Sequence, residues 1–188
     1  MNVYDFDKTI FAEDSTVAFY FFEIRRHPAL LRYAPRQLYG FAGYFLRLRN
    51  ITETKKYFYR YLQGIEDVDS ELKLFWDRNI DKVYDWYRKQ KREDDLIISA
   101  SADWLVKEAM SRLGVKNVIG SLVDKKTGEV LSPNCSRDQK VIRMKAAGYD
   151  LADMEKFYSD SLKDQPMASL ARESFMIIGG RPEPWPVK

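Results

Sequence analysis

Two aspartates separated by one residue stand near the start of the chain, in the run Asp5-Phe6-Asp7-Lys8-Thr9. The partly apolar residues 2–4 before them predict the end of a β-strand, whereas aspartate favours the turn that follows. Alternation along a strand would place Asp5 and Asp7 on the same side. Such a pair can act as a nucleophile with its proton donor, or as oxygen ligands for Mg²⁺. By itself the pair also fits ordinary turn chemistry, so its meaning depends on other polar residues.

Further polar groups stand where the chain predicts strand ends or helix starts, namely Ser99, Lys140, Asp160 and Asp164. Open α/β sheets bind ligands at the carboxyl ends of their strands, where such groups can converge. Carboxylates are suitable ligands for a hard divalent cation, while a lysine and a hydroxyl can hold phosphoryl oxygens. This set of residues therefore favours a site that binds a phosphate group bridged to Mg²⁺.

The elements that must position these groups fall into two kinds. Residues 15–91 are rich in aromatics and repeat apolar positions at helical spacing, which predicts four or five helices. After residue 91, short apolar strands at 96–99, 157–158 and 175–178 alternate with helices at 102–113, 138–147 and 166–172, which indicates a mainly parallel α/β sheet. Residues 118–123 and 129–131 flank Lys126-Thr127-Gly128 and predict a β-hairpin. The proline-rich residues 179–188 are expected to be irregular.

The predicted first strand precedes the helical block, and the other strands follow it, so the block is interpreted as an insertion. We therefore expect an α/β, Rossmann-like core formed by residues 1–14 and 92–188. An all-helical cap subdomain is expected over residues 15–91.

The order of these residues resembles the haloacid dehalogenase (HAD) superfamily. The matching features are the Asp5–Thr9 run, Ser99 at the end of an apolar strand, Lys140, and the run Asp160-Ser161-Leu162-Lys163-Asp164. The 94 residues from Asp5 to Ser99 hold the helical block. A helical cap at that place is typical of the phosphoserine-phosphatase-like branch.

The resemblance implies a phosphatase that works through an aspartyl-phosphate. Asp5 would be the nucleophile, and Asp7 would be the acid that protonates the leaving alcohol and then the base that activates water. Asp5, the backbone carbonyl of Asp7 and Asp160 would bind Mg²⁺, with Asp164 supporting the metal ligands or Lys140. An aspartate pKa of about 3.9 is too low for a proton donor near neutrality, so the pKa of Asp7 must be raised.

Phosphate binding is expected from Ser99, Ala100 and Lys140, and Asp14 is expected to contact the substrate from the entry to the cap. Phosphoserine phosphatases typically have glutamate where this chain has Asp14. Relatives also commonly have glycine where this chain has Ser159.

Each of these residues also has a purely structural interpretation. Ser99 can be an ordinary strand-end hydroxyl, and Ser101 can cap the following helix. Asp160 and Asp164 can be turn and capping residues. Lys140 lies in a basic stretch, where lysines are usually solvated, although its place in the first turn of a helix favours a role at the site.

The composition excludes several classes of site. His27 is the one histidine and Cys135 the one cysteine, so neither a two-histidine site nor an intrachain disulfide is possible. A cysteine-based phosphatase would have arginine six positions after Cys135, where this chain has Val141. The single cysteine fits a reducing compartment. The predicted strand begins almost at Met1, which leaves no room for a targeting segment, and no long apolar run predicts a membrane span. We therefore expect a cytoplasmic protein.

Charge is concentrated in one segment. Residues 25–60 contain nine Lys/Arg and one acid, a net charge of 9 − 1 = +8, whereas the whole chain has 31 − 28 = +3. Aromatic residues alternate with these cations. The segment can be an amphipathic helical surface with snorkelling basic side chains, or a surface for an anionic substrate or an anionic membrane. No nucleic-acid motif accompanies it.

Together these observations predict a Mg²⁺-dependent hydrolase of a small phosphorylated metabolite. A phosphatase acting on a lipid head group at a membrane surface is an alternative, with peripheral membrane contact through the basic, aromatic cap. A non-catalytic phosphate-binding module is another alternative. The sequence does not determine the oligomeric state or the physiological substrate.

Overall fold

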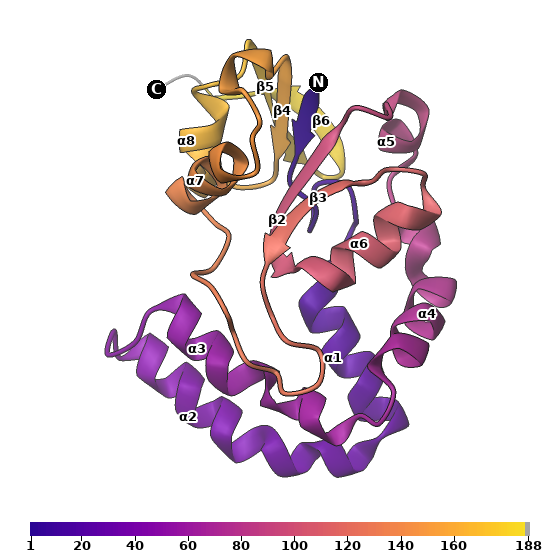
Figure 1. The fold of residues 1–188 in the computed structure, drawn as a ribbon, viewed down its shortest axis with the longest axis vertical. Coiled ribbons are helices and arrows are strands. Elements are labelled where there is room, and N and C mark those ends of the chain that lie inside the picture. The colour runs from indigo at the N-terminus through magenta and orange to yellow at the C-terminus, as the bar shows by residue number, and fades with distance from the viewer. Residues whose placement is uncertain (187–188) are drawn as a thin grey trace.

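A computed structural model describes residues 1–186 and has a mainly parallel sheet of six strands in the order β3-β2-β1-β4-β5-β6 (Figure 1). The first five strands run parallel to their neighbours, and the last pairs antiparallel with β5. The strands are β1 (Asn2–Tyr4), β2 (Leu96–Ala102), β3 (Asn117–Ser121), β4 (Lys156–Ser159), β5 (Glu173–Ile178) and β6 (Arg181–Pro184). The predicted α/β fold class is confirmed.

The chain between β1 and β2 is helical, as predicted. Its elements are α1 (Ser15–Arg26), the 3₁₀ helix η1 (Pro28–Tyr33), α2 (Ala34–Phe45), α3 (Ile51–Phe58), η2 (Tyr59–Gly64), α4 (Val68–Asn79), η3 (Ile80–Lys82) and α5 (Asp85–Gln90). Figure 1 shows α2 and α3 projecting below the sheet as an antiparallel pair.

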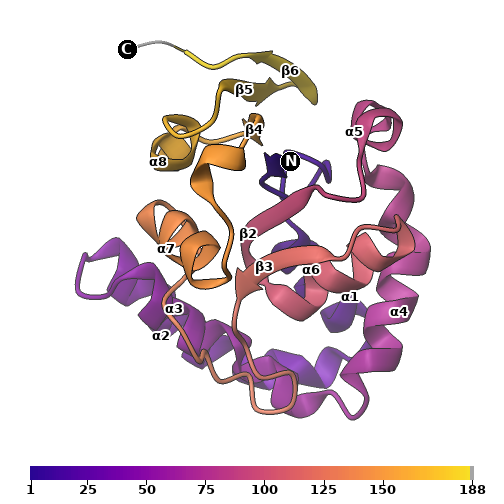
Figure 2. The ribbon, with the colours of Figure 1, turned by 45° about the horizontal axis from the view of Figure 1, so that its top comes forward.

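The remaining helices complete a three-layer arrangement. They are α6 (Asp103–Arg112), α7 (Asp138–Ala146), η4 (Leu151–Asp153), η5 (Leu162–Asp164) and α8 (Gln165–Ala168). Alternate strand residues serve opposite faces, because Val3 and Phe157 join one apolar cluster while Tyr4 and Tyr158 join another. Figure 2 shows α7 and α8 on one side of the sheet and α4, α5 and α6 on the other.

The helical insertion shares its hydrophobic core with the sheet. One buried cluster contains Tyr4 and Ile97 from the strands together with Phe19 from α1 and Trp76 from α4. The Trp76 indole N–H also donates a hydrogen bond to the backbone oxygen of Leu105 in α6 (2.9 Å). The predicted boundaries of core (1–14 and 92–188) and cap (15–91) stay a prediction, and residues 187 and 188 lie outside the described part.

Three local expectations were wrong. Residues 117–121 form an edge strand that pairs in parallel with β2, and the predicted hairpin is reduced to a short turn that is closed by backbone hydrogen bonds and one bridge between Val123 and Val130. The proline-rich tail contains β6, an edge strand where the missing amide protons of proline are tolerated. The helix expected at 166–172 is only the short α8.

Among the residues that the structure describes, we find no helix that is both long and apolar enough to span a membrane.

A buried carboxyl group lies between α1 and α4. Glu23 is completely buried, and neither of its carboxyl oxygens accepts a hydrogen bond from residues 1–186. Glu71 and His27 face it, with His27 Nε2 4.0 Å from Glu23 Oε2, while Arg26 pairs with Glu71 at 2.7 Å. Burial, followed by the charge of Glu71, raises the pKa of Glu23 to about 8.

This raised pKa predicts a pH-dependent stability. Above the ordinary glutamate pKa of 4.5, the unfolded chain releases a proton that the folded protein retains up to about pH 8. We therefore expect the free energy of unfolding to fall by at least about 2 kcal/mol as the pH rises through this window. Urea denaturation should show a steeper decline in the wild type than in Glu23→Gln, which keeps only the contribution of the other buried carboxyl groups such as Asp5. Exposed Glu66→Gln is the control, and an equal decline in Glu23→Gln would contradict this interpretation.

Candidate active site

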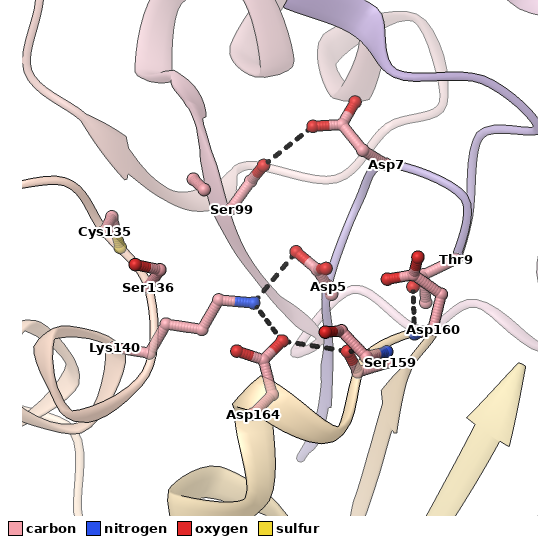
Figure 3. Close-up of polar contacts among 12 residues, drawn as sticks. Asp5, Asp7, Thr9, Ser99, Cys135, Ser136, Lys140, Ser159, Asp160 and Asp164 are labelled. Carbon is pink, nitrogen blue, oxygen red and sulfur yellow. Dashed lines mark hydrogen bonds and ion pairs between the residues drawn. The ribbon is translucent and has the colours of Figure 1, made fainter. Parts of the chain in front are cut away.

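The predicted polar residues converge at the carboxyl ends of β1, β2 and β4 (Figure 3). The Asp5 amide donates to the backbone oxygen of Tyr158 (2.8 Å), so Asp5 extends the pairing of β1 with β4. Ser99 lies within β2, and Asp160 follows β4 directly. The parallel register therefore brings together residues that lie more than ninety positions apart in the chain.

Lys140 joins two of these carboxylates. It lies in the first turn of α7, is almost completely buried, and places Nζ 2.9 Å from Asp5 Oδ1 and 2.6 Å from Asp164 Oδ2 (Figure 3). Burial lowers the pKa of Lys140, but the charges of Asp5 and Asp164 outweigh it and hold that pKa above the usual lysine value. The structure thus excludes the solvated alternative for Lys140.

Ser159 fixes the position of Asp164. Its hydroxyl donates to Asp164 Oδ2 (2.8 Å) and accepts a hydrogen bond from the Ser161 amide (3.2 Å). The serine that replaces the glycine common in relatives therefore has a polar partner on each side. Asp164 is held at its place by Ser159 and Lys140 together.

Asp160 lies across the site from Lys140, beside the first turn of the chain. Its backbone N–H donates to the Thr9 hydroxyl (2.9 Å), which ties the loop after β4 to the Asp5–Thr9 run (Figure 3). Burial raises the pKa of the Asp160 carboxyl, while the charges of Lys140 and Lys8 lower it. Lys8 itself adopts a left-handed backbone conformation (φ 56°) and is exposed, as expected for a residue that points outward.

Asp7 faces the start of α1 and the end of β2. Its Oδ1 accepts the Ser15 amide proton (2.7 Å), and its Oδ2 accepts the Ser101 hydroxyl (2.5 Å) and, at 3.5 Å, the Ser99 hydroxyl. Burial, followed by the charge of Asp14, raises the pKa of Asp7, as an acid that works near neutrality requires. Ser101 is thus a neighbour of Asp7, a role that the sequence did not reveal.

Asp5 also has an elevated pKa. Burial raises it, the charge of Lys140 opposes this, and the charges of Asp164 and Asp7 add to it, so that the pKa of Asp5 lies at about 7. The ion pair with Lys140 therefore does not fully offset the effect of burial on Asp5.

A cavity of about 340 Å³ opens beside Asp5 and Lys140. The predicted residues Asp14, Ala100 and Asp164 line it together with residues that sequence reasoning did not assign, which are Tyr44, Ile51, Lys55, Asn134, Ser136, Arg137, Ser161 and Lys163. Asp14 also caps α1, since its carboxylate accepts the Val17 amide proton (3.0 Å). The cavity thus places carboxylates beside several cations.

Lys55 connects the helical insertion to the sheet. From α3 its Nζ donates to the backbone oxygen of Ala100 (2.7 Å) and to Asn134 Oδ1 (2.6 Å). Burial lowers the pKa of Lys55 to about 8, against the opposing charges of Asp7 and Asp14. Lys55 belongs to the basic segment noted in the sequence, but no spacing rule distinguished it from its basic neighbours.

The donor set fits Mg²⁺. Asp5 Oδ2 and the side-chain oxygens of Asp160 accept no hydrogen bond from another residue within 1–186, and both groups have raised pKa values. Carboxylate oxygens without a hydrogen-bond partner are the ligands that a hard divalent cation prefers. Asp5, Asp160 and the backbone carbonyl of Asp7 are the residues that would hold it.

Comparison with known protein families gives one match over most of the chain. A family model described as haloacid dehalogenase-like hydrolase matches residues 3–169. No curated protein sequence matches the chain significantly.

Solved structures share the fold. A protein of unknown function from Bordetella pertussis Tohama I is 18% identical, with a TM-score of 0.78 over 94% of this chain and 88% of that chain. A phosphoserine phosphohydrolase-like protein from Francisella tularensis SCHU S4 is 13% identical, with a TM-score of 0.59 over 96% and 88% of the two chains. A HAD family hydrolase from Salmonella enterica serovar Typhi is 15% identical, with a TM-score of 0.56 over 90% of this chain and 59% of that chain.

The central role of Lys140 leads to a stability prediction. Lys140→Met should lower the free energy of unfolding by about 3–5 kcal/mol, because it leaves Asp5 and Asp164 buried without a cation. The double variant Lys140→Met/Asp164→Asn should recover part of this loss, since one buried charge is removed. Urea denaturation measures both. Lys145→Met, at an exposed lysine on the same helix, is the control, and a midpoint for Lys140→Met equal to that of the control would refute the bridging role.

Proposed function

The chain belongs to the haloacid dehalogenase-like hydrolases, and from this membership we propose that it is a Mg²⁺-dependent phosphomonoester hydrolase that works through an aspartyl-phosphate. The observation that carries the proposal is the placement of Asp5, whose Oδ1 is held by Lys140 while Oδ2 accepts no hydrogen bond within residues 1–186. A positioned carboxylate beside a cation-lined cavity is arranged to attack a phosphorus atom.

In the first step, an Asp5 carboxylate oxygen forms a bond to phosphorus while the bond from phosphorus to the ester oxygen breaks. Asp7 in its protonated form donates the proton that the leaving alkoxide takes up. The raised pKa of Asp7 supports this role, and its contacts with Ser15 and Ser101 fix its direction. The products of this step are a free alcohol and phosphorylated Asp5.

In the second step, water attacks the phosphorus of the aspartyl-phosphate, and ionised Asp7 accepts the proton from that water. The bond between Asp5 and phosphorus breaks, which releases inorganic phosphate and restores the Asp5 carboxylate. Lys140, together with Ser99 and the Ala100 backbone, would hold phosphoryl oxygens and offset their negative charge. Asp164 keeps Lys140 in place through their 2.6 Å contact.

Mg²⁺ would neutralise the charge between the phosphoryl group and the carboxylates of Asp5 and Asp160. Burial, and after it the charges of Asp164 and Asp7, raise the pKa of Asp5 in spite of Lys140, and a bound cation would act in the opposite direction. With the ion bound, Asp5 would be ionised at neutral pH and available as the nucleophile.

For the substrate, we propose a phosphomonoester whose phosphate enters the cavity beside Lys140. The volume of about 340 Å³ suits a small phosphorylated group, and Lys55, Arg137 and Lys163 supply further positive charge. A lipid head group is the second candidate, because exposed apolar residues of the helical insertion continue to the edge of this cavity.

For location, we propose the cytoplasm, since the single cysteine is buried as a free thiol.

The proposal predicts metal-dependent release of phosphate. With Mg²⁺ and a panel of phosphomonoesters we expect turnover, which a chelator should abolish and renewed Mg²⁺ should restore. Asp5→Asn should reduce the release to background, because the nucleophile is absent, while exposed Asp153→Asn should keep wild-type activity. If the folded, Mg²⁺-saturated wild type released phosphate from no member of the panel, the non-catalytic phosphate-binding alternative would be favoured.

The role of Asp7 predicts a separation of the two steps. Asp7→Asn should lower turnover of an alkyl phosphate by about 10²–10⁴-fold, the usual contribution of an acid–base group. With p-nitrophenyl phosphate the leaving group needs no proton, so the variant should release about one equivalent of nitrophenolate rapidly and then stall at the aspartyl-phosphate. Rapid-quench measurements and the mass of the acid-quenched protein test this. Steady turnover of the nitrophenyl ester without a burst would argue against Asp7 as the base.

A further inference from the structure

Helix α2 buries small and polar residues and exposes apolar ones. The residues that it buries are Gln37, Gly40 and Gly43, whereas Leu38, Phe41 and Phe45 are exposed to solvent. The exposed residues follow the i, i+3, i+7 spacing that normally marks the buried stripe of an amphipathic helix. The apolar stripe of α2 therefore faces away from the protein.

Tight packing against α3 fixes this orientation. A Cβ atom added to Gly40 would lie 2.7 Å from the Tyr57 Cβ atom, so only glycine allows the two helices to approach so closely here. On the same face, the Gln37 side chain donates to the backbone oxygen of Phe58 (3.0 Å) and accepts the Tyr20 hydroxyl proton (2.6 Å). The hydrogen bonds of Gln37 and the close approach at Gly40 fix which face of α2 is buried. The apolar stripe on the other face therefore points toward solvent.

The exposed apolar side chains form one surface, here named the α2 surface. Phe45 is 78% exposed and Leu48 76%, which is unusual for such large apolar side chains. The α2 surface consists of Leu38, Tyr39, Phe41, Tyr44, Phe45, Leu46, Leu48 and Ile51, eight of the large apolar residues that are exposed within residues 1–186. An apolar patch of this kind marks an interaction site.

Cations without acidic partners surround this surface. Arg36 and Arg47 are exposed and lie within ion-pair distance of no carboxylate of residues 1–186. Arg49 stacks on Tyr39 at 4.1 Å and on Tyr57 at 4.9 Å, which holds its charge at the same edge. With Glu53 as the one acid in residues 25–60, the surroundings of the α2 surface are strongly positive.

The α2 surface reaches the candidate active site. Tyr44 and Ile51 belong to this surface and also line the cavity beside Asp5 and Lys140. Figure 1 shows α2 on the far side of α3 from the sheet, so a flat partner can contact α2 without meeting the sheet. A molecule held at the α2 surface can therefore present a phosphate to the cavity.

We propose that the α2 surface docks on an anionic lipid bilayer and that the enzyme hydrolyses a phosphomonoester head group of a lipid in that bilayer. The substrate part of this proposal rests on the function proposed above. Apolar side chains would enter the boundary between head groups and acyl chains, while Arg36 and Arg47 contact anionic head groups. The exposed apolar stripe with flanking arginines is the pattern of helices that lie in a membrane interface.

Charge complementarity favours a bilayer over a second copy of the chain. A symmetric dimer through this surface would bring Arg36 and Arg47 of both copies together, and like charges at an interface are unfavourable. An anionic bilayer instead offers negative charge around an apolar interior, which matches both properties of the surface.

Vesicle sedimentation tests the docking. Asp5→Asn protein, which cannot turn over substrate, should sediment with phosphatidylcholine vesicles that contain phosphatidylglycerol and not with pure phosphatidylcholine vesicles. Phe41→Ser/Phe45→Ser in this background should weaken binding by at least about tenfold through lost apolar burial. Arg36→Ala/Arg47→Ala should weaken it by about fivefold per charge, and less at high salt. Ile142→Ser/Ile178→Ser, at exposed apolar residues outside this surface, should bind like the parent.

Three results would overturn the docking. The first is equal binding of Phe41→Ser/Phe45→Ser and its parent, and the second is the absence of binding to the anionic vesicles. The third is a dimer, seen by light scattering without lipid, that becomes monomeric in Phe41→Ser/Phe45→Ser, because a second copy would then cover the surface. Circular dichroism spectra and urea midpoints equal to the parent's confirm that the variants are folded.

Measurements of phosphate release test the proposed lipid substrate separately from the docking on the bilayer. Wild-type protein should release phosphate from phosphatidic acid in the anionic vesicles at least about tenfold faster than Phe41→Ser/Phe45→Ser does, while both should hydrolyse soluble p-nitrophenyl phosphate equally. Vesicle binding without hydrolysis of either compound would refute the proposed function and leave the docking intact. Hydrolysis of p-nitrophenyl phosphate but not of phosphatidic acid by vesicle-bound protein would refute the lipid substrate alone.

Discussion

The buried ion pairs of Lys140 with Asp5 and Asp164 are the interaction on which the candidate site depends. Carboxylates from β1 and from the segment after β4 would repel one another if they were brought together without a cation. The ammonium group reaches them from the first turn of α7 at 2.9 Å and 2.6 Å, and Ser159 holds Asp164 from the other side. Because a buried charge is costly without a partner, this arrangement fixes three segments of the chain relative to one another.

The two aspartates of the first turn, Asp5 and Asp7, have different electrostatic surroundings. Asp5 contacts Lys140 and has an oxygen without a hydrogen-bond partner in residues 1–186, as suits a nucleophile. Asp7 is turned toward Ser15 and Ser101 and lies near Asp14, which together with burial raises its pKa, as suits a proton carrier. The different roles proposed for these two chemically identical residues thus rest on their neighbours alone.

The helical insertion has two parts with different physical character. Helices α1 and α4 share the apolar core of the sheet, and Lys55 of α3 adds hydrogen bonds to Ala100 and Asn134 at the cavity. Within residues 1–186, helix α2 has no such partner on its outer face and exposes its apolar stripe there. The part that closes the cavity and the part proposed to meet lipid are therefore adjacent, which couples access to the site with contact at the α2 surface.

The sequence by itself determined the α/β class and the helical segment between the first two strands, because hydrophobic periodicity is a local signal. Motif order and family resemblance predicted the candidate residues Asp5, Asp7, Ser99, Lys140, Asp160 and Asp164. The tertiary structure alone decided what depends on contacts between distant segments. Residues 117–121 became an edge strand because β2 offers a parallel neighbour, and β6 formed because β5 leaves an open edge. Nothing local distinguished Lys55 or Ser101 from similar residues nearby. Helical periodicity gave α2 an apolar stripe, but only packing of Gly40 against Tyr57 showed that the stripe points outward.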